Sequence, residues 1–302
     1  MKTRIFCLFI IILALLFTGC SDKNNGTPVQ SEQAGSDAQV KIVTSFYPMY
    51  IMALNITEGI TGVEVVNMTK SMTGCLHDYQ LTPGDMKNLQ DARIMIVNGA
   101  GMESFLDEII ERQVDLKIIN ASEGLELIKE ADGEVNPHLW VSVTGAINQV
   151  NNIGRQLAEL DPSRAESYLE NTAAYVKKLE ALKQRMHERL DQIKNRDIVT
   201  LNDAFPYFAQ EFKLNIKGII QQEPDSEPSA GELVKIINEI KESEVKAIFT
   251  EPEDSYQSAK TIARETGVKI CYLDPAVSGP LDPDAYIKIM EENLKALEEA
   301  LK

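Results

Sequence analysis

The chain has 302 residues and a formal net charge of −16 at pH 7, with 46 acidic and 30 basic side chains. So acidic a surface makes nucleic acid a poor partner, although it suits a cationic ligand. Two of the four cysteines lie in the first twenty positions. The other two, Cys75 and Cys271, do not make a disulfide framework, but they could pair in an oxidising compartment.

The first residues are typical of an export signal. Basic residues precede a short apolar run, Ile5–Phe17, and small residues follow it just before Cys20. This pattern predicts a signal peptide over residues 1–19 and looks like a bacterial lipoprotein processing site, with Cys20 as the lipidated residue. A transmembrane anchor is the alternative, but the run is too short to span a membrane comfortably. Because a single lipid chain binds a membrane only marginally, we expect Cys20 to carry two acyl chains as the membrane anchor.

Residues 20–39 are rich in Ser, Asn, Gly and Gln and contain few apolar side chains. Such a composition predicts a flexible tether. The rest of the chain, from residue 40 on, is too long to pack around a single hydrophobic core, which favours two lobes. We expect an N-terminal lobe at 40–160, a linking helix at 161–195 and a C-terminal lobe at 196–302.

Apolar, β-branched runs alternate with helical patterns in the N-terminal lobe. The predicted strands are Val40–Phe46, Gly62–Met68, Arg93–Asn98 and Leu116–Asn120. The predicted helices are Pro48–Glu58, one beginning near Pro83, Met102–Arg112, Ser122–Lys129 and Val141–Leu160. Strand followed by helix, repeated, predicts a parallel sheet with helices on both faces.

One long helix is predicted next. Asp161 is a suitable N-cap and Pro162 fits the first helical position. Seven apolar residues then recur at helical spacing: Tyr168, Tyr175, Leu179, Leu182, Met186, Leu190 and Ile193. About 33 residues at 1.5 Å each make a rod about 50 Å long. We interpret it as a rigid link between two lobes rather than a coiled-coil strand, and we expect His187, off the stripe, to be solvated.

The second lobe repeats the plan of the first. Its predicted strands are Asp197–Leu201, Leu214–Ile220, Val245–Thr250 and Val268–Leu273. Its predicted helices are Ala204–Phe212, Ser229–Ser243, Ser255–Thr266 and Asp282–Leu301, the last capped by Asp282 and Pro283. The predicted fold class is therefore α/β, with two lobes, each a parallel four-stranded sheet with flanking helices, bridged by one long helix.

Ligands of open parallel sheets bind beyond the carboxyl ends of the strands. There the sequence places two of its three histidines, His77 and His138, together with Asn202, Glu251 and Asp274. Imidazole combined with carboxylate suits Zn, Mn or Fe(II) better than Ca or Mg. The spacing indicates a transition-metal site, although the chain has no compact metal-binding motif.

At these positions the sequence resembles the metal-specific solute-binding lipoproteins of bacterial ABC importers, the zinc and manganese receptors. The resemblance covers nearly the whole mature chain. It rests on these segments: His77-Asp78-Tyr79, Leu81–Met86, Asn98-Gly99 with Glu103, Asn136–Trp140, Asp203–Phe208, Glu227-Pro228-Ser229, Thr250-Glu251-Pro252 and Leu273-Asp274-Pro275. It implies two α/β lobes joined by a long helix, with metal bound between them.

The resemblance implies His77, His138, Asn202 and Asp274 as the metal ligands. Zinc-type members carry histidine and manganese-type members glutamate at the third position, where this chain has Asn202. An amide is a weak neutral ligand, so Glu251, Cys75 or water could complete the site. The absence of glutamate at that position favours zinc slightly over manganese.

The implied function is an extracytoplasmic, membrane-anchored, monomeric receptor that captures Zn or Mn and delivers it to an ABC permease and its ATPase. No catalysis is expected. One alternative is a paralogue with weakened metal binding that acts as an adhesin or binds another ligand. A metallohydrolase is a further alternative, but the sequence has no HExxH or nucleophile-elbow motif.

Overall fold

The computed structural model describes residues 39–69, 76, 79–106, 115–130, 133–221, 227–251 and 257–302. The predicted signal peptide, the predicted lipidation site Cys20 and the predicted tether up to residue 38 lie outside the described residues, as do Cys75 and His77. In the part of the chain that is described, no helix combines the length and apolarity needed to cross a membrane.

Four parallel strands form the first sheet in the order β2–β1–β3–β4. They are β1 (Val40–Thr44), β2 (Val63–Asn67), β3 (Ile94–Val97) and β4 (Lys117–Asn120). The side chains of the central strands are buried on both faces, as expected for a parallel sheet covered by helices. Helix α1 (Tyr47–Ile56) packs on one face, and α2 (Pro83–Gln90) packs on the other.

The second sheet repeats this topology in the order β6–β5–β7–β8, again with parallel strands. Its strands are β5 (Asp197–Thr200), β6 (Asn215–Ile219), β7 (Ala247–Thr250) and β8 (Lys269–Tyr272). Helices α7 (Ala230–Glu242) and α8 (Gln257–Thr266) cover one face. Helix α6 (Pro206–Phe212) contributes to the core on the other face. The predicted α/β fold class is confirmed.

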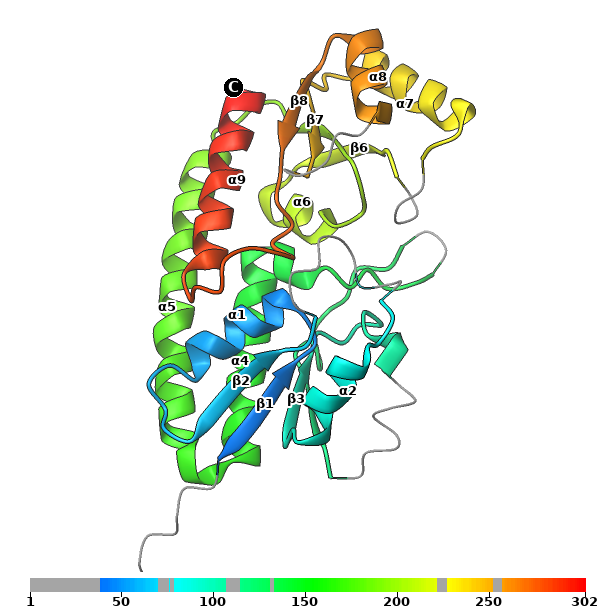
Figure 1. Ribbon diagram of the computed structural model, residues 1–302. Coiled ribbons are helices and arrows are strands. Elements are labelled where there is room, and N and C mark those ends of the chain that lie inside the picture. Colours follow the sequence, from blue (N-terminus) through cyan, green and yellow to red (C-terminus); the bar gives the residue numbers. More distant parts are fainter. Residues whose placement is uncertain are drawn as a thin grey trace, which may run out of the picture. The chain divides into compact units, whose positions relative to one another are not determined.

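Two long helices link the first sheet to the second, and a third packs beside them. Helix α4 (Val143–Leu160) leads into α5 (Ala165–Leu190), and the final helix α9 (Ala285–Leu301) packs along α5 (Figure 1). Helix α5 has 26 residues, which at 1.5 Å each span about 39 Å. Gly154 of α4 permits close packing on α5, because a Cβ at this position would lie 2.0 Å from Oγ1 of Thr172.

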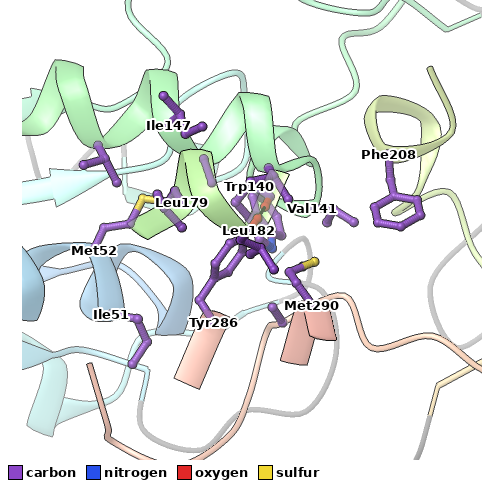
Figure 2. Close-up of a cluster of buried hydrophobic side chains, with 14 of the residues drawn as sticks. Ile51, Met52, Trp140, Val141, Ile147, Leu179, Leu182, Phe208, Tyr286 and Met290 are labelled. Carbon is purple, nitrogen blue, oxygen red and sulfur yellow. Dashed lines mark hydrogen bonds between the residues drawn. The ribbon is translucent and has the colours of Figure 1, made fainter. Parts of the chain in front are cut away.

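The predicted apolar stripe of α5 is confirmed, because Tyr168, Tyr175, Leu179 and Leu182 are all buried. The stripe packs within one continuous hydrophobic core that takes side chains from both halves of the chain (Figure 2). The labelled members are Ile51, Met52, Trp140, Val141, Ile147, Leu179, Leu182, Phe208, Tyr286 and Met290. The long helix therefore shares its core with both sheets.

The starts of two helices differ from the prediction. The chain forms a 3₁₀ turn at Pro162–Arg164 before α5, and Asp161 makes no side-chain cap. Its carboxylate instead accepts hydrogen bonds from the side chains of Ser163, Arg164 and Tyr168. Likewise α9 begins at Ala285 rather than Asp282, because Asp282 accepts the backbone N–H of Asp284 in a preceding turn.

The predicted helix at Ser122–Lys129 is wrong. A turn ends at Gly124, whose φ is +71°, and the segment then runs without helical hydrogen bonds. The N–H of Ile128 donates to the hydroxyl of Tyr207, and Lys129 pairs with Val135 in an antiparallel bridge. Backbone N–H groups that would donate within a helix therefore donate to other parts of the chain instead. Of the predicted helix Met102–Arg112, a 3₁₀ turn forms at Ser104–Leu106, and residues 107–112 lie outside the described residues.

Candidate metal-binding site

The imidazole of His138 is oriented by the residue two positions before it. Asn136 Oδ1 accepts the backbone N–H of His138 at 3.0 Å and lies 3.1 Å from Nδ1 of the ring. The His138 side chain is only 3% exposed. With Nδ1 donating to an amide oxygen, Nε2 is the nitrogen suited to bind a metal, which is the usual arrangement of metal-ligating histidines.

Hydrogen bonds anchor this segment to both predicted ligand segments of the second lobe. Asn136 Nδ2 donates to the backbone oxygen of Asp203 at 2.9 Å, next to Asn202. Trp140 Nε1 donates to the backbone oxygen of Pro275 at 2.8 Å, next to Asp274. The structure therefore brings the His138 segment against the strand ends that carry Asn202 and Asp274.

A buried carboxylate supports the same segment from the first lobe. Glu103 accepts hydrogen bonds from the Ser45 hydroxyl and from the backbone N–H groups of Asn98 and Gly99. The Asn98 amide in turn donates to the backbone oxygen of Pro137 at 3.0 Å. Burial raises the pKa of Glu103 to about 7, even though its three donors favour the charged form.

Asn202 follows β5 and contacts a carboxylate. Its Nδ2 donates to Glu251 Oε1 at 2.5 Å, while its Oδ1 accepts the backbone N–H of Ala204 at 3.2 Å. Glu251, an alternative ligand in the sequence analysis, therefore lies beside the predicted third ligand. Both side chains are partly buried.

Asp274 follows β8 and is held by its own backbone and by α9. The N–H of Ala276 donates to Asp274 Oδ1 at 2.7 Å, and the amide of Asn293 bonds both main-chain groups of Asp274 at 2.8 Å each. Burial, followed by the charges of Asp274 and Asp282, raises the pKa of Tyr47 to about 12. The negative charge of Asp274 therefore lies close enough to Tyr47, the first residue of α1, to affect its ionisation.

His77 and Cys75 lie outside the described residues. Within the described ranges, no group of three or more His, Cys, Asp or Glu side chains is arranged to hold a metal ion. Cys271 on β8 is a free cysteine, and Cys75, its possible disulfide partner, lies outside the described residues. Burial raises the pKa of the Cys271 thiol, which makes it a poor metal ligand at neutral pH.

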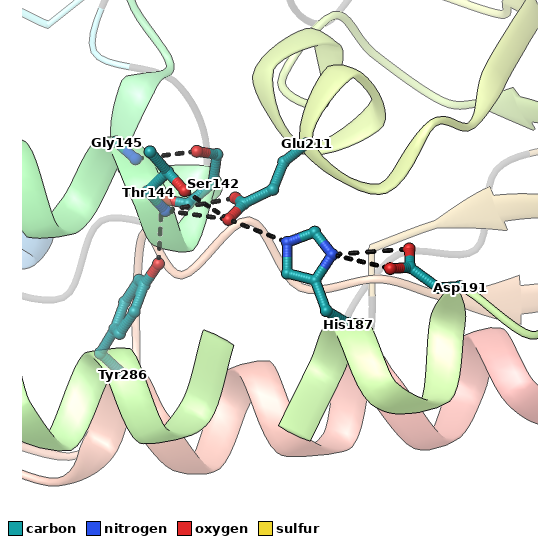
Figure 3. A network of polar contacts seen from close by, with 7 residues as sticks. All are labelled: Ser142, Thr144, Gly145, His187, Asp191, Glu211 and Tyr286. Atoms are coloured by element: carbon teal, nitrogen blue, oxygen red, sulfur yellow. Dashed lines mark hydrogen bonds and ion pairs between the residues drawn. The ribbon is translucent and has the colours of Figure 1, made fainter. Parts of the chain in front are cut away.

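A second polar network joins the lobes away from these residues (Figure 3). Glu211 of α6 accepts the hydroxyl of Thr144 at 2.6 Å and the Thr144 N–H at 3.2 Å, at the start of α4. His187 of α5 lies 3.8 Å from Glu211 and 3.4 Å from Asp191. The expectation that His187 is simply solvated was wrong, because its ring also packs 4.9 Å from the ring of Phe212. No local sequence pattern links Thr144 to Glu211, so sequence reasoning missed this contact.

The sequence of the chain is similar to those of known metal-transport proteins. The family described as zinc-uptake complex component A, periplasmic, matches residues 42–300. The high-affinity zinc uptake system protein ZnuA of Bacillus subtilis is 30% identical over 315 residues, covering 97% of each chain. The manganese-binding lipoprotein MntA of Halalkalibacterium halodurans is 28% identical over 301 residues, again covering 97% of each chain.

A solved structure extends the likeness to three dimensions. The laminin-binding protein Lmb of Streptococcus agalactiae, described as bifunctional with adhesin and metal-transporting activity, superposes with a TM-score of 0.77. It is 28% identical, and the match covers 87% of this chain and 100% of that one. Taken with the family match over residues 42–300, these likenesses show that the chain belongs to the zinc-uptake complex component A family, the metal-binding solute-binding proteins of bacterial ABC importers.

Proposed function

We propose that the chain is a lipid-anchored, extracytoplasmic, monomeric receptor that captures one Zn or Mn ion between its two lobes. It delivers the ion to an ABC permease, which works with its own ATPase, and it catalyses no reaction. The zinc uptake and manganese binding named in its relatives support this proposal, as does membership of the family. Cys20 is the proposed lipidation site.

The observation that carries the proposal is the double anchorage of the His138 segment. Asn136 bonds the main chain beside Asn202, and Trp140 bonds the main chain beside Asp274. The segment that carries the buried His138 is thus bonded to two strand ends of the opposite lobe. A cation bound there would link the lobes directly.

The proposed ligands are His77, His138, Asn202 and Asp274. Two imidazoles, a carboxylate and a neutral amide form a donor set of mixed softness, which accepts both Zn and Mn. With the amide as the third ligand, the set leans toward zinc. Because an amide oxygen binds weakly, water or a neighbouring side chain would share that side of the ion.

Calorimetric titration of the metal-free mature chain with Zn or Mn tests the function. We expect one ion per chain, with binding lost in His138→Ala and retained in His187→Ala, which removes an imidazole outside the proposed site. If the wild type binds neither metal, the receptor function is wrong. Binding that survives in His138→Ala would instead rule out the proposed ligand set.

A second function, adhesion, has one observation in its favour. The Lmb structure is described as that of a protein with adhesin as well as metal-transporting activity. Adhesion without metal capture would follow if the wild type bound an immobilised matrix protein such as laminin but took up neither metal. Metal-dependent hydrolysis that disappears in His138→Ala would identify an enzyme instead.

A further inference from the structure

Helix α9 bonds to both segments that carry the described ligands of opposite lobes, and it does so from one side of the helix. Tyr286 and Asn293 are seven residues apart, which is about two turns, or about 10 Å along the helix axis. Both side chains are buried, with 3% and 2% exposure. Met290 and Leu297 on the same helix are fully buried in the core, so packing fixes the position of this face of α9.

Tyr286 holds the ligand-bearing segment of the first lobe. Its hydroxyl donates to the backbone oxygen of Trp140 at 2.8 Å, two residues after His138. The hydroxyl also lies 3.4 Å from the backbone oxygen of Ser142, just before α4 (Figure 3). Burial holds the pKa of Tyr286 well above its usual value of 10, so the hydroxyl remains a hydrogen-bond donor.

Asn293 holds Asp274 of the second lobe. Its Oδ1 accepts the backbone N–H of Asp274, and its Nδ2 donates to the backbone oxygen of Asp274, each at 2.8 Å. A cavity of about 420 Å³ adjoins this contact, and its lining includes both residues together with Tyr272 and Lys288. Because a cavity takes the place of packed side chains there, the two hydrogen bonds rather than close packing hold Asp274 to α9.

A third hydrogen bond closes a ring of contacts. The indole N–H of Trp140 donates to the backbone oxygen of Pro275 at 2.8 Å, and Pro275 directly follows Asp274. The ring runs from α9 through Tyr286, Trp140, Pro275, Asp274 and Asn293 back to α9. Because the ring is closed, neither segment can move relative to the other without breaking one of its bonds.

We propose that α9 positions the metal site, with Tyr286 and Asn293 as its two positioning residues. They keep the segment of His138 and the loop of Asp274 at the separation that a shared cation requires. Neither of the two is a ligand. This inference rests on the proposed function, because it takes His138 and Asp274 as ligands of one ion.

Two substitutions in α9 open the ring at different places. Tyr286→Phe removes only the hydroxyl, and Asn293→Ala removes both bonds to Asp274. Calorimetric titration of the metal-free mature chain with Zn and with Mn measures the effect. We expect binding to weaken several-fold in Tyr286→Phe and about 10- to 100-fold in Asn293→Ala, the usual effect of losing a group that holds a metal ligand in place.

Matched controls separate positioning from general stability. Tyr168→Phe removes a buried hydroxyl that bonds Asp161, and Asn171→Ala removes an amide that bonds the backbone oxygens of Ile56 and Glu58. These bonds involve neither ligand segment. Both controls should therefore unfold at a lower temperature than the wild type while binding metal as tightly as it does.

The double variant distinguishes a ring from two independent supports. Tyr286 and Asn293 are two turns apart and share no bonding partner, so their losses of stability should add. Metal affinity should behave differently, because opening the ring at one place already frees the two segments. The double variant should therefore lose less affinity than the product of the two single losses.

If both single variants bind metal as tightly as their controls while His138→Ala binds none, the proposed function stands and α9 does not position the site. A double loss equal to the product of the single losses would overturn the ring, because the two residues would then act separately. If the wild type binds neither metal, the proposed function fails and this inference fails with it. Thermal unfolding checks that each variant is folded. Should Asn293→Ala not fold, Tyr286→Phe, which removes a single oxygen atom, decides between the first two outcomes.

Discussion

The indole N–H of Trp140 donates to the backbone oxygen of Pro275 at 2.8 Å, joining two residues that are 135 positions apart. Trp140 is fully buried, and its ring lies 5.3 Å from the ring of His138. Pro275 directly follows Asp274. The bond therefore ties a proposed ligand segment of the first lobe to one of the second, without either ligand taking part in it.

Replacing Trp140 with Phe should cost stability and metal affinity together. Phe keeps one aromatic ring but is smaller than the buried indole, so a cavity forms. In addition the buried oxygen of Pro275 loses its donor, which alone costs about 1–3 kcal/mol. Metal affinity should fall several-fold because the Asp274 loop is held less firmly. Chemical unfolding and calorimetry measure the two effects. A loss of stability with unchanged metal affinity would show that this bond does not position Asp274.

Replacing Asn136 with Ala should weaken metal binding about 10- to 100-fold, the usual effect of losing the partner that orients a ligating imidazole. Asn136 fixes the His138 ring and also bonds the main chain of Asp203. Asn152→Ala is a matched control, because Asn152 bonds main-chain oxygens of Ala121 and Glu123 at another part of the lobe. Equal metal affinities in the two variants would contradict the orienting role.

Glu103 should make the stability of the metal-free protein depend on pH. Burial raises its pKa from 4.5 to about 7, so the folded state holds the proton more tightly than the unfolded chain does. Its contribution is fully present below pH 4.5 and is lost as the pH rises through 7. The stability of the wild type relative to Glu103→Gln should therefore fall across this window, by an amount on the order of 3 kcal/mol.

Urea unfolding of both proteins between pH 4.5 and pH 8 measures this difference. Because every other titrating group is common to the two, their difference isolates Glu103. A difference that is independent of pH, or one that grows as the pH rises, would contradict the raised pKa.

Glu211→Gln should lower stability by about 1–2 kcal/mol, because the charge-assisted bonds to Thr144 at the start of α4 become neutral. Glu188→Gln on the exposed side of α5 is the control and should change stability little. Thermal unfolding of the metal-free proteins compares them. Equal midpoints for the wild type and Glu211→Gln would show that this contact does not hold the lobes.

Much of the fold could be predicted from local pattern alone. The central strands β3 (Ile94–Val97) and β7 (Ala247–Thr250) are apolar runs whose side chains are buried on both faces. Prediction failed where tertiary hydrogen bonds outweighed local propensity. The N–H of Ile128 is taken by Tyr207, and the carboxylate of Asp161 is turned to Arg164 and Tyr168.

The placement of Asn202, Glu251 and Asp274 at strand ends was predictable, because parallel strands bring their carboxyl ends to one rim. The contacts between side chains were not. The sequence contains Asn202 and Glu251 but gives no sign that they bond each other, since this depends on the register between β5 and β7. The contact of Glu211 with Thr144 depends in the same way on how α6 packs near α4.

The most direct test of metal capture between the lobes is anomalous diffraction from crystals of the metal-loaded mature chain, recorded at the Zn and Mn absorption edges. We predict a single ion bound by His138 from the first lobe and by Asp274 from the second. An ion held by residues of one lobe only, or crystals of the loaded protein without an ion between these two side chains, would contradict it.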